Sequence, residues 1–197
     1  MKVYRHRVNS IDELLQTSRS FGVEIDIRTW GEEIIVTHDP FVYTELSLSL
    51  FLQSYRHNGI ILNVKEEGLE NRVQEILAIN GVSDYFFLDQ TIPYMLKLLN
   101  KGENRTSHKL SDIESIENLK LIQPKPGWVW VDSWSGSWEH LRQIEEVNKL
   151  GYRTCLCSPD VHRADYLAEL NSLQRMIKDM NLSFDAVCTK YPEKWSK

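Results

Sequence analysis

Short apolar runs that alternate with segments of helical period constrain this chain more than any other feature of its sequence. The apolar runs read as strands at residues 2–5, 23–28, 59–65, 84–89, 107–110, 128–132, 152–158 and 184–189. Helical patterns lie at 46–55, 69–79, 93–99, 138–150 and 164–180, and further helices are expected to begin near Ser10, Ser111 and, for the 138–150 pattern, Ser137. This order is typical of a parallel α/β architecture.

The number of strands favours a closed barrel over an open sheet. Residues 34–36 follow the strand at 23–28 after a tight turn, so they are interpreted as a hairpin extension of it. Eight units remain, and we predict a compact (β/α)8 TIM barrel in which residues 1–197 form a single domain. Because such barrels typically have about 250 residues, some helices or loops must be minimal. The absence of a Gly-rich loop after the first strand disfavours an open nucleotide-binding sheet.

The strand at 23–28 carries charge on one of its two faces. Successive side chains of a strand alternate, so Glu24 and Asp26 point the same way, while the valine and isoleucines between them form an apolar face. At a rise of roughly 3.3 Å per residue the two carboxylates lie about 7 Å apart. Both can therefore reach one divalent cation. Taken alone, the pair also fits an exposed amphipathic edge strand.

Charge and cysteine content exclude several classes of function. Twenty-three Lys and Arg against 28 Asp and Glu give a formal charge of −5, which disfavours a nucleic-acid partner. The first residues lack the apolar core of a signal peptide, and no stretch approaches the roughly 20 apolar residues of a membrane span. We therefore expect a cytoplasmic protein. The three cysteines have neither disulfide-framework nor C-x-x-C spacing and are interpreted as buried strand residues.

Polar side chains collect where the predicted strands end. In a barrel of this type the chemistry lies at the C-terminal ends of the strands. The candidates there are His6, Arg7, Glu24, Asp26, Arg28, His38, Asp39, Asn63, Lys65, Glu67, Asp89, Asp132, Ser158, Asp160, His162 and Lys190. His162 is interpreted as structural, on a loop that overhangs the site.

Two histidines, several carboxylates and a lysine at one end of a barrel predict phosphodiester cleavage. A hard cation neutralises a phosphoryl oxygen, one imidazole takes a proton from the attacking oxygen, and the other protonates the leaving oxygen. The donors are oxygen atoms and no cysteine or histidine cluster has zinc spacing, so Mg²⁺ or Ca²⁺ is the expected cofactor.

The same residues resemble the glycerophosphodiester phosphodiesterase family, within the phosphatidylinositol phospholipase C-like superfamily. The family opens with His-Arg, a downstream E-x-D on a strand and a His-Asp at the end of the next run; this chain has His6-Arg7, Glu24-Ile25-Asp26 and His38-Asp39. Residues 184–192 are similar to its closing G-V-D-x-I-x-T-D-x-P. The resemblance implies a (β/α)8 barrel with His6 and His38 as the acid/base pair, Glu24 and Asp26 as metal ligands, and Arg7 as a phosphate contact.

The chain departs from that family pattern in four places. Val8 stands where the family has glycine, and Asn63 stands where a glutamate supplies the third metal ligand. Asn63 can coordinate through its carbonyl oxygen, and Glu67, on the same predicted face, is the alternative. Lys190 replaces the usual aspartate near the C-terminus; with Lys65 it adds positive charge to a phosphate pocket or lies on its rim. The insertion that follows His-Asp in the family is largely missing, so the headgroup specificity does not carry over.

These observations favour a metal-dependent hydrolase of a small alcohol or sugar phosphodiester, and two alternatives stay open. The amide at Asn63 and the short chain also fit a phosphate-binding barrel that has lost turnover. A metal-assisted lyase that forms a cyclic phosphate uses the same residue types. The expected partner is a small-molecule phosphodiester, and the sequence does not determine the oligomeric state.

Overall fold

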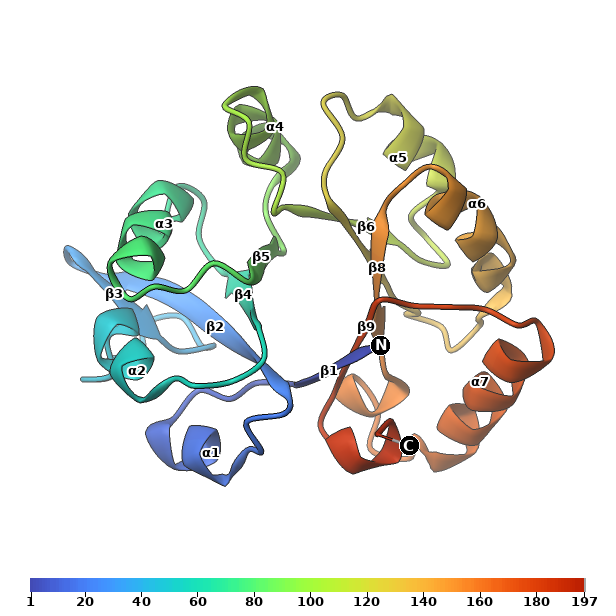
Figure 1. Cartoon of the computed structure of the whole chain (residues 1–197), viewed down its shortest axis with the longest axis horizontal. Helices are drawn as coiled ribbons and strands as arrows, with labels where there is room; N and C mark the ends of the chain where they lie inside the picture. The colour runs from blue at the N-terminus through green and yellow to red at the C-terminus, as the bar shows by residue number, and fades with distance from the viewer. Residues whose placement is uncertain (197) are drawn as a thin grey trace.

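The computed structural model describes residues 1–196, and its central feature is one sheet of nine strands surrounded by helices (Figure 1). The strands are β1 (Lys2–Arg5), β2 (Gly22–Trp30), β3 (Glu33–Val36), β4 (Ile60–Val64), β5 (Tyr85–Leu88), β6 (Ser107–Leu110), β7 (Trp128–Val131), β8 (Arg153–Cys157) and β9 (Ala186–Thr189). The α-helices are α1 (Ile11–Gln16), α2 (Leu48–Ser54), α3 (Glu70–Ile79), α4 (Ile92–Asn100), α5 (Ile116–Leu121), α6 (Ile144–Lys149) and α7 (Leu167–Asp179). Three 3-10 helices complete the described structure: η1 (Glu139–Gln143), η2 (Pro159–Val161) and η3 (Pro192–Lys194).

Eight of the nine strands run parallel and nearly close a barrel, in the order β5-β4-β2-β1-β9-β8-β7-β6. β3 is antiparallel to the end of β2, which confirms the predicted hairpin extension. The two ends of the strand order, β5 and β6, are joined by an isolated parallel bridge between Phe87 and Thr106 and by a 2.7 Å hydrogen bond from Ser107 Oγ to the Phe87 carbonyl. The predicted TIM-barrel fold is therefore confirmed.

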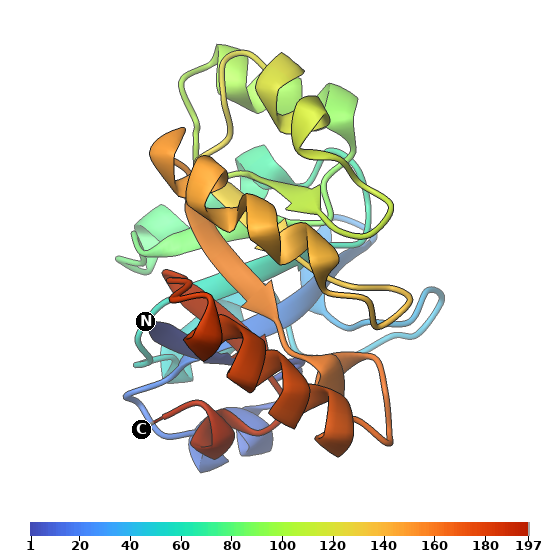
Figure 2. The same ribbon diagram turned by 90° about the vertical axis from the view of Figure 1, so that its right-hand side faces the viewer.

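Two apolar layers build the barrel. The outward side chains of the strands pack beneath the surrounding helices, and Figure 2 shows α6 and α7 on the outside of the strands. The interior is filled by aromatic and small side chains, among them Phe86 and Trp128, whose rings stack with centroids 4.4 Å apart. The three cysteines are free and buried in β8 and β9, as predicted.

Strand parity brings the charged face of β2 into this interior. Tyr4 points inward from β1, and Ile61 points inward from β4. Glu24 pairs in register with Ile61, and Asp26 pairs with Asn63, so both carboxylates face the barrel interior rather than water. Glu24 is 0% exposed and Asp26 is 1% exposed. The edge-strand interpretation of this pair is wrong.

The helix starts predicted from capping residues agree with the structure in part. Ser10 caps α1, and the Glu13 carboxylate accepts hydrogen bonds from the Ser10 hydroxyl at 2.9 Å and from the Asn9 N–H at 3.0 Å, which is a variant of the capping box. The helix expected over 138–150 instead begins as the 3-10 helix η1, and the Ser137 side chain does not cap it. A tight 3-10 turn at the start of an α-helix is common.

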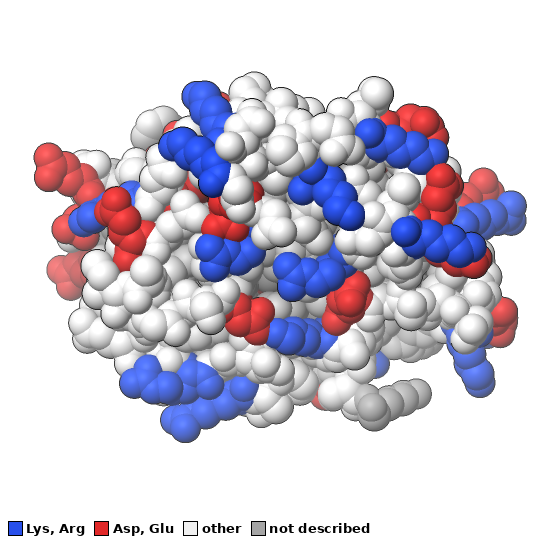
Figure 3. Space-filling model, turned by 45° about the horizontal axis from the view of Figure 1, so that its top comes forward, with Lys and Arg blue, Asp and Glu red and all other residues white. Residues whose placement is uncertain are grey.

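The surface carries mixed charge and no candidate membrane span. On the face drawn in Figure 3, Lys and Arg side chains lie interspersed with Asp and Glu. Among the described residues, the structure has no helix that is both long enough and apolar enough to cross a bilayer.

Candidate active site

A cavity of about 210 Å³ opens at the C-terminal ends of the strands and gathers most of the predicted site residues. Its polar lining consists of His6, Arg7, His38, Asn63, Lys65, Asp89, Lys109, Asp132 and His162, and its apolar lining includes Trp130 and Trp134. Both predicted acid/base histidines therefore line one space, together with two of the predicted substrate-binding residues.

A strained turn after β1 aims a backbone amide at Glu24. Arg7 has a φ of +53°, a left-handed conformation that residues with a Cβ rarely adopt. Its N–H donates to Glu24 Oε2 at 2.6 Å. The Nε2 atom of His6 lies 3.6 Å from the same oxygen. Such strain persists where surrounding contacts stabilise it, and here the hydrogen bond to the buried Glu24 carboxylate is such a contact.

The environment of Glu24 opposes its negative charge. Burial, followed by the neighbouring Asp26 carboxylate, raises the pKa of Glu24 to about 8, against the smaller opposing effects of the Arg7 amide, Asn63 and Lys65. Its Oε1 atom and the Oδ1 atom of Asn63 are both buried and have no hydrogen-bond partner within residues 1–196. Two unpartnered buried oxygen atoms on neighbouring strands are a donor set that fits a hard divalent cation.

Asp26, in contrast, is already surrounded by donors. Asn9 holds it twice: its Nδ2 donates to Asp26 Oδ2 at 2.7 Å, and its Oδ1 accepts the Asp26 N–H at 2.9 Å. Arg7 Nε lies 3.7 Å from Oδ2, and Lys65 Nζ lies 3.2 Å from Oδ1. A cation shared by Glu24 and Asp26 would therefore compete with the Lys65 ammonium for Oδ1.

Lysines and carboxylates alternate across the mouth of the barrel. Lys65 also lies 3.7 Å from Asp89 Oδ2, and Lys109 Nζ lies 2.8 Å from Asp89 Oδ1. Asp89 has a φ of +61°, the second strained residue with a Cβ that lines the cavity. Burial would lower the pKa of Lys109, but the Asp89 carboxylate outweighs it and raises that pKa. Lys109 is therefore a cation at neutral pH in this arrangement.

The two predicted catalytic histidines have different surroundings. The His6 side chain is 12% exposed, and burial, with the nearby Arg7 cation, lowers its pKa to about 4, so its ring is neutral at pH 7. The His38 side chain is 37% exposed, and its Nδ1 lies 2.7 Å from Asp39 Oδ1. The His38 carbonyl accepts a 2.9 Å hydrogen bond from Arg28 Nε, which fixes the end of β3 over the cavity. This pair can supply one neutral base and one carboxylate-oriented imidazole.

Two predicted site residues lie away from this group. Glu67 is exposed beyond the end of β4 and accepts a 3.0 Å hydrogen bond from Thr91 Oγ1. Lys190 is exposed after β9, and its Nζ donates to the Val161 carbonyl at 3.1 Å. The structure therefore does not bring Glu67 to Glu24 and Asp26, and it places Lys190 beside the cavity lining rather than in it.

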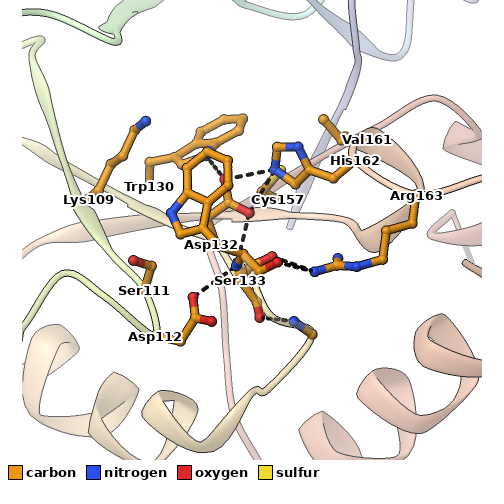
Figure 4. A network of polar contacts seen from close by, with 12 residues as sticks. Lys109, Ser111, Asp112, Trp130, Asp132, Ser133, Cys157, Val161, His162 and Arg163 are labelled. Carbon is orange, nitrogen blue, oxygen red and sulfur yellow. Dashed lines mark hydrogen bonds and ion pairs between the residues drawn. The ribbon is translucent and has the colours of Figure 1, made fainter.

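Asp132 and His162 form a contact, on the cavity wall opposite Glu24, that was not predicted from the sequence. Asp132, at the end of β7, lies 3.0 Å from His162 Nε2 through each of its carboxylate oxygens. Figure 4 shows this pair beside Cys157 and Trp130, and the Trp134 and His162 rings pack with centroids 5.0 Å apart. Asp132 and His162 were both visible as strand-end residues; their contact depends on the pairing of β7 with β8.

Comparison with solved structures supports the fold. A glycerophosphoryl diester phosphodiesterase from Parabacteroides distasonis ATCC 8503 superposes with a TM-score of 0.68 at 14% identity, over 97% of this chain and 83% of that one. A glycerophosphodiester phosphodiesterase from Agrobacterium tumefaciens str. C58 gives a TM-score of 0.66 at 14% identity, over 98% and 97% of the two chains. The resemblance noted in the sequence therefore extends to the fold.

Sequence comparisons add little to this. No family model matches the chain. A glutamate–tRNA ligase from Buchnera aphidicola subsp. Cinara cedri (strain Cc) is 26% identical over 80 residues, which is 41% of this chain and 17% of the ligase. The chain thus spans about a sixth of that ligase, and the match carries no argument about function.

Proposed function

We propose that the protein is a metal-dependent phosphoric diester hydrolase that acts on a small alcohol or sugar phosphodiester. The observation that carries the proposal is the joint lining of one cavity by His6, His38, Arg7 and Lys65, directly above the buried Glu24 and Asp26 carboxylates. The likeness in fold to glycerophosphodiester phosphodiesterases agrees with it.

The cation would be held by Glu24, Asp26 and Asn63. The unpartnered Oε1 and Oδ1 atoms of Glu24 and Asn63 fit this role, and oxygen donors suit Mg²⁺ or Ca²⁺. When bound, such a cation supplies charge neutralisation at a non-bridging phosphoryl oxygen. Lys65 has a second partner in Asp89, so it remains paired if a cation replaces it at Asp26. With only two carboxylates in the set, the affinity for the cation is expected to be modest.

The two histidines divide the proton transfers. His6, whose lowered pKa keeps it neutral, accepts the proton of the attacking water. His38, oriented by Asp39, protonates the leaving alcohol oxygen. Arg7 and Lys65 bind the phosphate oxygens and hold the diester between the two rings.

The test is turnover of a glycerophosphodiester and of an activated aryl phosphodiester by purified protein, with Mg²⁺ or Ca²⁺ and with chelator. We expect hydrolysis that depends on the cation and stops on chelation. Phosphorus NMR of the products separates a monoester, from hydrolysis, from the cyclic phosphate of a lyase. No turnover with any divalent cation at any pH from 5 to 9 would refute the proposal.

Two observations favour a second candidate, a phosphate-binding barrel without turnover. The Lys65 ammonium is already paired with Asp26, where a catalytic cation has to bind, and an amide occupies the third ligand position at Asn63. Calorimetric binding of a phosphodiester that is never hydrolysed would support this candidate. In that case Lys65→Met is expected to abolish binding, and chelator to leave it unchanged.

A further inference from the structure

A second group of ligand-type side chains lies on the wall of the cavity opposite Glu24. One donor atom each from Asp132, Cys157 and His162 lies within 4.8 Å of the other two. Asp132 follows β7, Cys157 ends β8, and His162 follows η2, so three segments of the fold converge there. Figure 4 shows the three side chains directed toward one another.

The distances within this group are short enough for all three side chains to share one metal ion. His162 Nε2 lies 3.0 Å from both oxygens of Asp132, so without a metal the two side chains share a bifurcated hydrogen bond. The same nitrogen lies 3.6 Å from Cys157 Sγ. Tetrahedral zinc with bonds of about 2.1 Å to nitrogen and about 2.3 Å to sulfur separates those two ligands by about 3.6 Å.

Hydrogen bonds from neighbouring residues fix the Asp132 side chain and the loop that follows it. Trp130 Nε1 donates to Asp132 Oδ2 at 3.1 Å, and the Ser133 N–H donates to Oδ1 at 2.7 Å. Arg163 Nη2 donates to the Ser133 and Trp134 carbonyls at 2.9 and 3.0 Å, which fixes the loop that follows Asp132. Hydrogen bonds of this kind orient metal ligands and raise metal affinity.

We propose that Asp132, Cys157 and His162 form a zinc site whose fourth position opens into the cavity. The thiolate and the imidazole of this set suit zinc and not Mg²⁺, and a carboxylate can complete a zinc site. Asp132 and His162 line the cavity, while Cys157 is 1% exposed behind them. Three protein ligands with one open position are typical of zinc sites that bind a water or a substrate oxygen. On binding, the thiol proton of Cys157 leaves to solvent and the thiolate takes its place on the metal.

The test is metal binding, which needs no substrate and therefore stands apart from the proposed hydrolase activity. Metal-stripped protein is titrated with Co²⁺ and, separately, with Zn²⁺. We expect one tightly bound ion per chain, apart from any weaker binding at Glu24 and Asp26, with an intense thiolate-to-cobalt charge-transfer band and the visible bands of tetrahedral Co²⁺. Cys157→Ser removes the charge-transfer band and weakens zinc binding at least about 100-fold. Cys155→Ser, which changes a buried cysteine of the same strand outside the group, leaves both unchanged.

Further variants keep the inference falsifiable if Cys157→Ser does not fold. His162→Ala changes a side chain that is 30% exposed and is expected to weaken zinc binding by the same order. Trp130→Phe keeps an aromatic ring in the core but removes the donor to Asp132, and it is expected to weaken zinc binding roughly 10- to 100-fold. Glu24→Gln leaves the thiolate-to-cobalt charge-transfer band unchanged, because that band reports only on Cys157. A wild-type titration without a charge-transfer band, or zinc affinity that is equal in wild type and His162→Ala, would overturn the proposal.

Discussion

Replacement of the buried Glu24 by glutamine is predicted to change how stability depends on pH. Burial and Asp26 raise the pKa of Glu24 from 4.5 to about 8 in the folded protein. The folded state therefore keeps a proton that the unfolded chain releases between these two values. The stabilisation is complete below pH 4.5 and is lost as the pH rises to about 8. Each pKa unit corresponds to about 1.4 kcal/mol, so the loss is on the order of 5 kcal/mol.

The assay is urea unfolding in chelator at pH 5 and pH 8.5. Glutamine keeps an acceptor for the Arg7 N–H and can donate its amide to the unpartnered Asn63 Oδ1, so Glu24→Gln is expected to fold. When the pH is raised from 5 to 8.5, the unfolding free energy of wild type should fall by several kcal/mol more than that of Glu24→Gln. The exposed control Glu45→Gln should follow wild type. A cation at 100 times its Kd should restore about 2.7 kcal/mol at pH 8.5 in wild type only. Parallel pH profiles for wild type and Glu24→Gln would refute the reasoning.

Three further predictions concern the fold, the rim and the phosphate contact. Gly22→Ala places a Cβ into the Tyr4 ring and 2.9 Å from the Gly59 carbonyl, so urea unfolding should show a loss of at least about 1–3 kcal/mol, and an unchanged midpoint would contradict this packing. Asp112 accepts the Trp134 and Ser135 N–H groups at 2.8 Å each; burial opposes its charge, but these bonds lower its pKa to about 2. Asp112→Asn should therefore lower Tm by roughly 2–4 °C at pH 7. This difference in Tm from wild type should disappear as the pH falls from 3.8 to about 2. The same difference at pH 7 and at pH 2 would contradict this role of Asp112. Lys65→Met should lower kcat/KM for the phosphodiester roughly 10- to 100-fold. The control Lys97→Met, on the exposed side of α4, should leave kcat/KM unchanged. Equal effects of the two substitutions would show that Lys65 does not bind the substrate.

Local periodicity explains which parts of the site could be predicted from the sequence. Inward-facing positions alternate strictly within a strand, so Glu24 and Asp26 on β2 and Asn63 on β4 could be placed together. The same rule was extended past the end of β4 to Glu67, where it no longer applies, because the chain has left the strand at Val64. Lys190 likewise lies past the end of β9, where strand alternation no longer sets the direction of a side chain. Its Nζ points to the Val161 carbonyl instead and donates a hydrogen bond to it.

The opposite wall of the cavity could not be predicted because its contacts are not local. Cys157 and His162 lie only five residues apart, but Asp132 is remote from both in the sequence, and the pairing of β7 with β8 brings it to them. Asn9 is a similar case: its two hydrogen bonds to Asp26 cross from the β1–α1 loop to β2. Asp160 was visible as a strand-end residue, but it is buried and bonds Thr189 Oγ1 and the Lys190 N–H, so it joins the ends of β8 and β9 instead of lining the cavity.

The central claim is that the cavity hydrolyses phosphodiesters with His6 and His38 as its acid/base pair. The most direct measurement is the single-turnover rate with a glycerophosphodiester, whose alkoxide leaving group needs protonation, and a divalent cation, for wild type, His6→Ala, His38→Ala and the control His57→Ala. His57 precedes β4 at the other end of the barrel and bonds the Thr17 carbonyl. The account predicts a loss of about 100-fold or more in each of the first two variants and no loss in the third. Wild-type rates in both His6→Ala and His38→Ala, with all four proteins folded, would contradict it.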